Sequence, residues 1–167
     1  MPATPLVSIL VNNFNYGQYV ETAIRSALAQ DYILIEVIVV DDGSTDDSRE
    51  RISKFGRQVT AIFKDNAGQA SALNLGIAEA HGEFILILDS DDYLLPSAVS
   101  VCVRSFPQGY AHIYFHLNAV DSAGNPDPKL NSAIPFVEFD GNAIAAVAKG
   151  SAFPATVTTA NFFGQAF

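Results

Sequence analysis

A run of large apolar residues leads directly into three carboxylates in Phe84-Ile85-Leu86-Ile87-Leu88-Asp89-Ser90-Asp91-Asp92. The apolar part is typical of a strand that is buried on both faces of a parallel sheet. The carboxylates then follow at its carboxyl end, where open α/β sheets bind ligands. Two unit charges about 6 Å apart repel by about 3 kcal/mol at an effective dielectric of about 20. This repulsion predicts a compensating hard divalent cation. The alternative is a solvated acidic turn that caps the next helix.

Short apolar runs alternate with amphipathic helical repeats through the first two-thirds of the chain. Strands are predicted at residues 6–11, 35–40, 59–63 and 84–88. Helices are predicted at residues 19–29, around Ile52 and Phe55, from Gly68 through Ala80, and after Pro96. Regular alternation of strand and helix indicates an α/β fold with a mostly parallel sheet and right-handed crossovers. The strand order predicted at the core of the sheet is 3-2-1-4.

In that order the connections reverse direction between the first and fourth strands, which is where such sheets bind ligands. The loops expected to meet there contain residues 12–15, 41–42 and 89–92. Although these segments are far apart in sequence, the topology predicts that they line one crevice.

Each of these segments has a functional and a structural interpretation. The acidic pair at residues 41–42 could accept a hydrogen bond from a base or sugar, or it could serve only turn and cap chemistry. Phe14 and Tyr16 offer aromatic faces for a planar base, or they pack beneath the following helix. Gly68 opens a predicted helix whose N–H groups could face an anion, or it only shapes the loop.

Size and composition restrict the class of protein. With 167 residues and 49% apolar residues, the chain is expected to form a single domain over residues 1–167. The net charge of -9 argues against a nucleic-acid partner, and the lone Cys102 against a disulfide framework or cysteine zinc site. No signal peptide and no apolar segment long enough to span a bilayer is recognised, so a cytoplasmic protein is expected.

The last third of the chain has a different pattern of residues. A strand is predicted at residues 111–120, a turn at 121–126, a short helix at 141–148 and an extended segment at 155–163.

Together, four segments resemble the nucleotide-sugar-binding part of inverting family 2 glycosyltransferases, which have the Rossmann-like GT-A fold. The matching motifs lie at residues 7–15, 39–46, 66–76 and 82–92. Four motifs in order are far more specific than a single D-x-D.

The resemblance implies a role for individual residues. Asn12 and Phe14 match positions that contact the nucleotide, and Asp42 matches the carboxylate that reads the base. Asp89 would approach the ribose, and Asp91, with Asp89, would hold Mg²⁺ or Mn²⁺ against the diphosphate. Gly68 belongs to the third motif and is included in the nucleotide-sugar site.

The implied reaction is inverting transfer from a nucleotide-diphosphate sugar, with UDP-sugars favoured, to a hydroxyl of a saccharide or lipid-linked acceptor. The metal would neutralise charge on the leaving nucleoside diphosphate, and a carboxylate base would take the acceptor proton. The family's base lies in the acceptor-binding part, and no acidic residue here matches its motif. The base is therefore expected beyond Phe167, and the acceptor part is expected to be truncated.

Two other functions are open at this point. A non-catalytic nucleotide-binding or assembly module could keep the same fold. A sugar nucleotidyltransferase would need a basic, glycine-rich loop after the first strand, whereas residues 12–17 contain no basic residue.

Overall fold

The structure, a computed structural model, describes residues 4–105, 112–114, 119–121, 125–126 and 161–164. The strands are β1 (Val7–Asn13), β2 (Ile35–Asp42), β3 (Thr60–Lys64), β4 (Phe84–Asp89), β5 (His112–Tyr114) and β6 (Asn161–Gly164). The helices are α1 (Gly17–Leu28), α2 (Ser48–Ser53), α3 (Gln69–Glu79) and α4 (Ala98–Ser105), with a 3-10 turn at Gly56–Gln58.

The strands form one sheet in the order β3-β2-β1-β4-β6-β5. Strands β3, β2, β1 and β4 are parallel, which confirms the predicted α/β class and the 3-2-1-4 order. The sheet continues with β6, which runs antiparallel to β4 and pairs Phe84 with Gly164. That extension was not predicted from the sequence.

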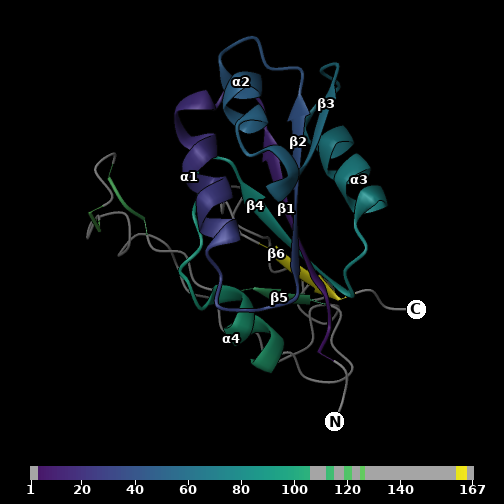
Figure 1. Cartoon of the computed structure of the whole chain (residues 1–167), viewed down its shortest axis with the longest axis vertical. Coiled ribbons are helices and arrows are strands. Elements are labelled where there is room, and N and C mark those ends of the chain that lie inside the picture. Colours follow the sequence, from purple (N-terminus) through teal and green to yellow (C-terminus); the bar gives the residue numbers. More distant parts are fainter. Residues whose placement is uncertain (1–3, 106–111, 115–118, 122–124, 127–160, 165–167) are drawn as a thin grey trace, which may run out of the picture. The chain divides into compact units, whose positions relative to one another are not determined.

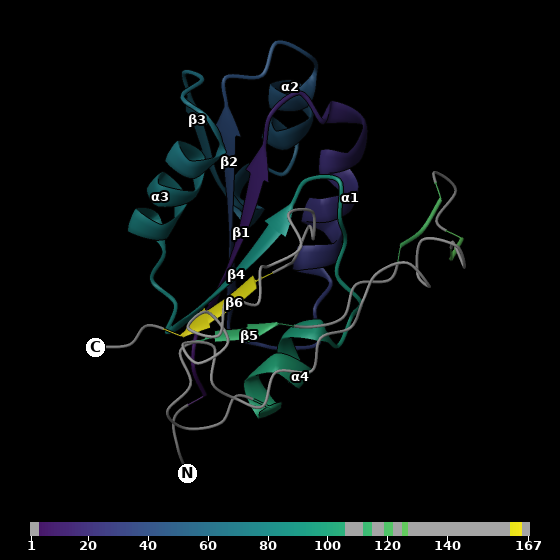
Figure 2. The same ribbon diagram turned by 180° about the vertical axis from the view of Figure 1, so that it is seen from behind.

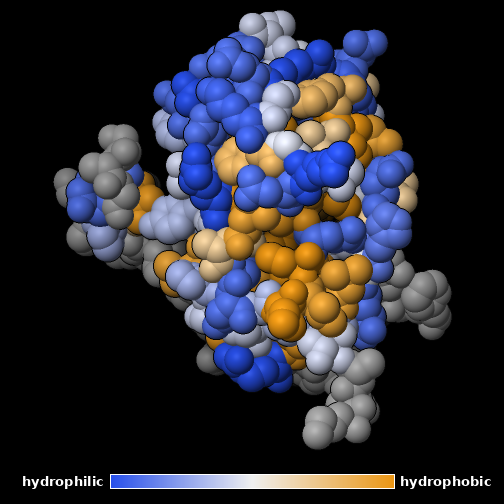
Figure 3. Space-filling model, in the orientation of Figure 1, coloured by the Kyte–Doolittle hydropathy of each residue, from blue (hydrophilic) through white to orange (hydrophobic). Residues whose placement is uncertain are grey.

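The helices lie on both sides of the sheet. Figures 1 and 2 show α1 and α2 on one side of the parallel strands and α3 on the other. Such an arrangement follows from right-handed crossovers that run first toward β3 and then back across the sheet to β4. In Figure 3, hydrophilic side chains gather over α1 and α2, where the ion pairs Arg51–Asp47 and Lys54–Glu50 lie.

The apolar core between α3 and the sheet takes alternate residues of the strands, and the residues between them, such as Ile9, Val39 and Leu86, are buried as well, so the strands read as continuous apolar runs. Its buried members are Leu10, Ile38, Val40, Ala72, Ile85 and Ile87. Helix α3 lies very close to β1, because a Cβ atom at Gly76 would be 2.2 Å from Leu10 Cδ1. The glycine therefore fixes the depth at which α3, and with it the loop before it, docks on the sheet.

Two predicted helices have different boundaries. Helix α1 begins at Gly17, before the predicted start at residue 19, and ends at Leu28. Helix α2 ends at Ser53, so that Phe55 lies beyond it and is buried in the following turn. Gly56 has a φ of 54°, and a left-handed residue of this kind is typical of helix ends.

Spatial proximity divides the chain into two compact units, Met1–Ile113 with Ala160–Phe167, and Tyr114–Thr159. In the second unit, the described residues show a bridge between Val120 and Pro126, within the segment predicted as a turn. The Asp121 N–H donates to the Asn125 carbonyl there at 2.8 Å.

Only parts of the predictions for the last third can be compared with the structure. Within the strand predicted at 111–120, β5 covers residues 112–114, and of the extended segment predicted at 155–163 the structure describes residues 161–163, which belong to β6. The helix predicted at 141–148 lies outside the described residues. A single domain and a cytoplasmic location stay predictions. Within the described part of the chain, no helix is long and apolar enough to cross a bilayer.

Candidate functional site

The carboxyl ends of the parallel strands bring polar residues from distant motifs together. The register pairs Asn12 with Asp89 and Asn13 with Asp41. Asp42 is paired with Lys64 at the end of β3. Because four parallel strands end at this edge, the residues that follow them share it, as the sequence predicted.

Asn12 and Asp89 are in direct contact, and Gln69 completes a three-residue cluster with them. Asn12 Nδ2 donates to Asp89 Oδ1 at 2.6 Å, and Gln69 Nε2 donates to the same oxygen at 3.2 Å. Gln69 Nε2 is also 3.4 Å from Asn12 Oδ1. Two residues of the predicted site thus meet, and a third joins them from the first position of α3.

Asp41 and Asp42 are both buried and both paired with a cation. Asp41 Oδ1 accepts from Arg49 Nε at 3.0 Å and from the Ser44 N–H at 3.0 Å. Asp41 Oδ2 accepts from Asn13 Nδ2 at 2.8 Å. Asp41 therefore stabilises the turn after β2, which is the structural one of the two interpretations of this acidic pair.

Asp42 holds the loop before α3 in place by accepting hydrogen bonds from its backbone. It accepts hydrogen bonds from Lys64 Nζ, from the Ala67 N–H at 3.0 Å and from the Gly68 N–H at 2.7 Å. Burial by itself raises the pKa of Asp42, but these hydrogen bonds and the Lys64 charge outweigh it and lower the pKa below its usual range. Asp42 is therefore an ionised, largely enclosed carboxylate. Its role in reading a base stays a prediction.

The acidic turn after β4 differs from the acidic pair at residues 41–42, because no described lysine or arginine forms an ion pair with it. The Asp92 N–H donates to the Asp89 carbonyl at 3.0 Å, and Asp91 is exposed. Asp92 Oδ2 is buried without a hydrogen-bond partner. Burial, and then the charges of Asp91 and Asp89, raise the pKa of Asp92 to about 6. Among the described residues, no lysine, arginine or histidine forms an ion pair with these three carboxylates.

These carboxylates have the chemistry that Mg²⁺ or Mn²⁺ requires, since both are hard cations that bind oxygen ligands. The unpartnered Asp92 oxygen also fits a cation that would compensate the local charge. In the described ranges, however, no three acidic, histidine or cysteine side chains converge closely enough to form a complete metal site. With Mg²⁺, a few protein carboxylates and substrate phosphates are the usual ligand set, so a partial site is compatible with the prediction.

The loop after β1 is held against the loop after β2 by Asn15. Its N–H donates to Ser44 Oγ at 2.8 Å, and its Oδ1 accepts from the Thr45 N–H at 2.8 Å. Asn15 has a φ of 58°, a conformation that asparagine tolerates better than most residues. These contacts fix the position of Phe14 and Tyr16 on either side.

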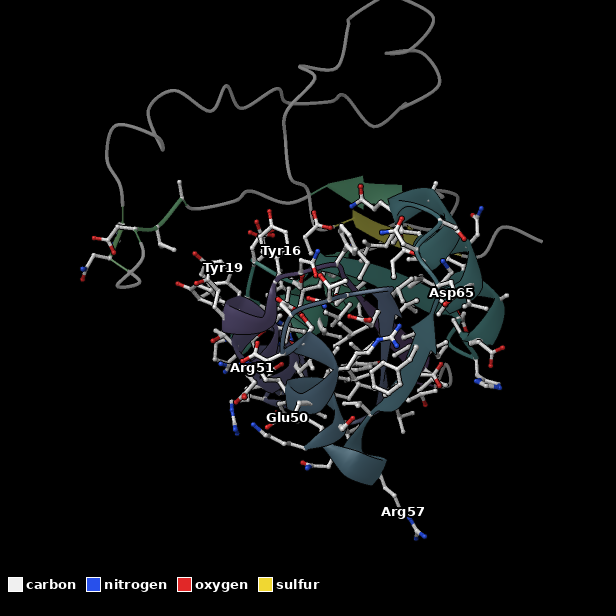
Figure 4. The ribbon with its side chains drawn as sticks, turned by 90° about the horizontal axis from the view of Figure 1, so that it is seen from above. Tyr16, Tyr19, Glu50, Arg51, Arg57 and Asp65 are labelled. Carbon is white, nitrogen blue, oxygen red and sulfur yellow. The ribbon has the colours of Figure 1, made fainter. Side chains whose placement is uncertain are left out.

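Phe14 and Tyr16 are both exposed, by 44% and 42%, and neither is buried beneath α1. Figure 4 shows Tyr16 beside Tyr19, with a ring-centroid distance of 6.0 Å, while Asp65 lies on the α3 side. The aromatic faces are therefore available to a ligand, which favours the stacking interpretation over the packing one.

Gly68 is the N-cap residue of α3 and has a φ of 88°, which favours glycine. Its N–H and that of Ala67 are directed at Asp42. The contribution of Gly68 that the structure describes is thus to shape the loop.

The contacts of Lys64 and Gln69 at this edge were missed in the sequence, whereas Asn15 was expected there as part of the loop at residues 12–15. Gln69 follows Gly68 in a motif that was recognised, so its position was visible. Its contact with Asp89 depends on the docking of α3, for which the sequence offered no signal.

The chain matches the family model described as glycosyl transferase family 2 over residues 8–159. It is 36% identical over 143 residues to the uncharacterized glycosyltransferase alr2836 of Nostoc sp., covering 78% of this chain and 44% of that protein. It is 43% identical over 105 residues to chondroitin synthase of Pasteurella multocida, covering 61% of this chain and 11% of the synthase. The chain therefore spans less than half the length of these relatives.

Solved structures agree with this similarity. TarS of S. aureus is 28% identical and aligns with a TM-score of 0.55 over 59% of this chain and 19% of its own. A fragment of TarS, residues 1–349, was solved with UDP-GlcNAc and aligns with a TM-score of 0.54 over 59% of this chain and 30% of its own. The mannosyltransferase PcManGT of Pyrobaculum calidifontis, solved with GDP-Man and Mn²⁺, shares the fold at 24% identity and a TM-score of 0.56, over 66% of this chain and 35% of its own. Because the family model matches most of the length of this chain, the chain belongs to glycosyl transferase family 2 and has the GT-A fold.

Proposed function

We propose that the chain is the donor-binding part of an inverting glycosyltransferase and holds a nucleotide-diphosphate sugar together with Mg²⁺ or Mn²⁺. One observation carries this proposal. At the edge where the strands end, the acidic pair at residues 41–42 is neutralised by Arg49 and Lys64, whereas the turn at 89–92 has no such partner in the described residues. The uncompensated turn is therefore where a cation and a diphosphate would bind together.

Each predicted site residue has a role in this proposal. Asp91, with Asp89, would hold the metal, and Asn12 would contact the nucleotide beside Asp89. Phe14 would stack on the base, which Asp42 would read from the end of β2. Gly68 shapes the loop that closes this side of the site. When bound, the metal would offset charge that develops on the leaving diphosphate.

The donor and acceptor classes are also proposals. UDP-sugars are favoured, and binding of UDP-GlcNAc by TarS, a neighbour at 28% identity, supports this choice. The acceptor would be a hydroxyl of a saccharide or of a lipid-linked saccharide. We assign the general base to no described residue.

Isothermal titration calorimetry with UDP and GDP, with and without Mn²⁺, tests the proposal. Asp91→Asn should weaken Mn²⁺-dependent binding by about tenfold or more, because even groups that only support a metal ligand contribute about 10- to 100-fold. Asp31→Asn removes an equal charge from an exposed residue between α1 and β2, at the end of the sheet away from the site, and should leave the affinity unchanged.

Two results would count against the proposal. Equal Mn²⁺-dependent affinity of Asp91→Asn and the unchanged chain would refute the metal assignment. A folded protein that binds neither nucleotide would refute the donor-binding function itself.

A further inference from the structure

Exposed aromatic side chains gather where α1 begins and where the acidic turn at residues 89–92 ends. Tyr16 and Tyr19 are exposed at the first turn of α1, and Tyr93 is exposed directly after the acidic turn. In the described part of the chain, Phe63 is the one large exposed aromatic residue outside α1 and the loops after β1 and β4. Aromatic surface that is gathered at one place marks a binding surface, whereas apolar residues scattered singly do not.

Tyr16 and Tyr19 form a pair whose faces stay open. Their ring centroids are 6.0 Å apart and their planes are tilted by 39°, so neither ring covers the other. Figure 4 shows the pair on the α1 side of the molecule. In the described ranges, no hydrogen bond involves either hydroxyl, whereas the Tyr32 hydroxyl donates to the Pro5 carbonyl at 2.7 Å. Both rings and both hydroxyls are therefore available to a ligand.

A hydrogen bond places the segment after β4 along the same side of α1. The Leu94 N–H donates to Ser26 Oγ at 3.0 Å. Ser26 follows Tyr19 by about two helical turns, so the two residues lie on one side of the helix. The chain thus passes from the end of β4, through the acidic turn and Tyr93, to this side of α1. The three tyrosines consequently border the acidic turn on its α1 side.

The chemistry of this surface suits a sugar ring. Beside Tyr19, the exposed residues in the first half of α1 are Gln18 and Thr22, and none is aliphatic. Exposed aliphatic residues such as Ile33 lie before β2, at the other end of the sheet. A membrane or an apolar protein partner would require such residues here. A pyranose ring has apolar C–H faces and hydroxyls at its edge, which match the apolar face and the hydroxyl of tyrosine.

The place of the tyrosines relative to the proposed donor site indicates which saccharide they would meet. Along the order β2, β1, β4, the proposed donor contacts run from Asp42 through Asn12 to the acidic turn, where the diphosphate would lie. The tyrosines lie past that turn, and none of them is needed for the proposed nucleotide contacts. The turn has no cationic partner among the described residues, which disfavours an anionic saccharide beside it.

We infer that Tyr16 and Tyr19, bordered by Tyr93, bind a sugar ring of an uncharged acceptor saccharide by stacking. The inference rests on the proposed donor-binding function and deepens it. It assigns part of the acceptor-binding surface to the first turn of α1, whereas the resemblance led us to expect the acceptor part beyond this chain.

The test uses the whole 167-residue chain with UDP and Mg²⁺, which unlike Mn²⁺ does not broaden NMR signals. Saturation-transfer NMR would follow binding of the methyl β-glycosides of glucose, galactose, N-acetylglucosamine and N-acetylgalactosamine, and of the β-linked disaccharides made from them. At least one should bind. Its Kd should rise about tenfold or more in Tyr16→Leu and Tyr19→Leu, as expected for the loss of an aromatic stacking partner. Calorimetry should give an unchanged Kd for UDP in both variants.

Two further variants are the controls. Ile33→Ala removes a large side chain that is 86% exposed, from the loop before β2, and should bind the saccharide as the unchanged chain does. Tyr19→Phe retains the ring and should stay within about threefold of the unchanged Kd, as expected for the loss of one hydrogen bond. Circular dichroism would establish that every variant is folded.

Each other outcome overturns the inference. If UDP binds but no saccharide does, or if the tyrosine variants bind the saccharide normally, this surface does not hold the acceptor while the donor-binding function stands. Equal weakening of UDP and saccharide would place the rings in the nucleotide site. If the variants abolish a gain of UDP-GlcNAc over UDP and leave the free saccharide unaffected, the rings contact the transferred sugar. Failure of UDP and GDP to bind the folded chain would refute the proposed function as well.

Discussion

Lys64 lies against Asp42 where β2 and β3 end, and water has little access to the pair. The side chain of Asp42 is 3% exposed and that of Lys64 17%. Removing one partner of a buried ion pair leaves an uncompensated charge and costs about 3–5 kcal/mol. Because Lys64 keeps some solvent contact, we expect Lys64→Met to lower the free energy of unfolding by about 2–4 kcal/mol. Urea denaturation followed by circular dichroism would measure it.

Lys54→Met is the matched control for this substitution. Lys54 pairs with Glu50 at 3.3 Å, but the two side chains are 57% and 76% exposed. Exposed pairs contribute about 0–1 kcal/mol, so this variant should be nearly as stable as the unchanged chain. Similar losses in both variants would show that burial does not distinguish the two pairs.

The residues of the site were predictable to different degrees. Asn12, Asp89 and Asp91 follow strands whose order could be predicted, so their place at one edge was predictable too. Lys64 and Gln69 could not be assigned, because their partners are set by the docking of β3 and α3. A lysine at the end of a strand or a glutamine at the start of a helix carries no local sign of its tertiary contact.

Glu36 connects three elements at the opposite end of the sheet from the proposed site. It accepts from Ser8 Oγ at 2.5 Å and from the His81 N–H at 2.6 Å, and Ser8 Oγ accepts from the Gly82 N–H at 2.8 Å. These contacts fasten the connection between α3 and β4 to the first residues of β1 and β2. Burial by itself raises the pKa of Glu36, but the hydrogen bonds from Ser8 and His81 outweigh it and lower the pKa.

The sign of the resulting pH dependence follows from the lowered pKa. A carboxylate whose pKa falls on folding stabilises the protein above its unfolded pKa, about 4.3 for glutamate, and stops doing so as the pH drops through the folded value. We expect Glu36→Gln to lower the free energy of unfolding by about 1–2 kcal/mol at neutral pH. The difference should shrink below about pH 4. Urea denaturation at several pH values would measure it.

Glu50→Gln is the control, because Glu50 is an exposed glutamate whose pair with Lys54 is open to solvent. It should show little change at any pH. A Glu36→Gln deficit that stayed constant down to strongly acidic pH would mean that packing, and not the carboxylate charge, stabilises this connection.

At the level of elements, the parallel half of the sheet was predictable and its continuation was not. Strands β1 to β4 are apolar runs that are separated from one another by helical repeats. Right-handed crossovers then fix the order of the strands. The pairing of β6 with β4 joins Phe84 to Gly164, which lie nearly half of the chain apart in sequence. No local pattern indicates which edge a distant strand will join, so that contact becomes visible only in the folded structure.

The charge of the whole molecule is a further constraint on ligand binding. The chain has a net charge of -9, and a nucleoside diphosphate is itself an anion. The exposed Asp91 and the unpartnered oxygen of Asp92 add to the repulsion at the proposed site. A metal cation bound between the nucleotide and the protein would therefore offset their repulsion, and we expect the metal and the nucleotide to bind cooperatively.

Thermal unfolding of the whole chain would show this cooperativity as a shift in Tm. A ligand present at about 100 times its Kd stabilises the folded state by about 2.7 kcal/mol, which corresponds to roughly 5–10 °C for a chain of this size. We expect Mn²⁺ with UDP to raise Tm by that amount, either ligand alone to raise it far less, and EDTA to reverse the shift. The core between α3 and the sheet consists of apolar side chains, which do not bind metal ions, so EDTA alone should leave Tm unchanged. If EDTA alone lowered Tm, the metal would be structural. If UDP alone gave the full shift in Tm, the cation would not be needed to bind the anionic nucleotide to the anionic protein.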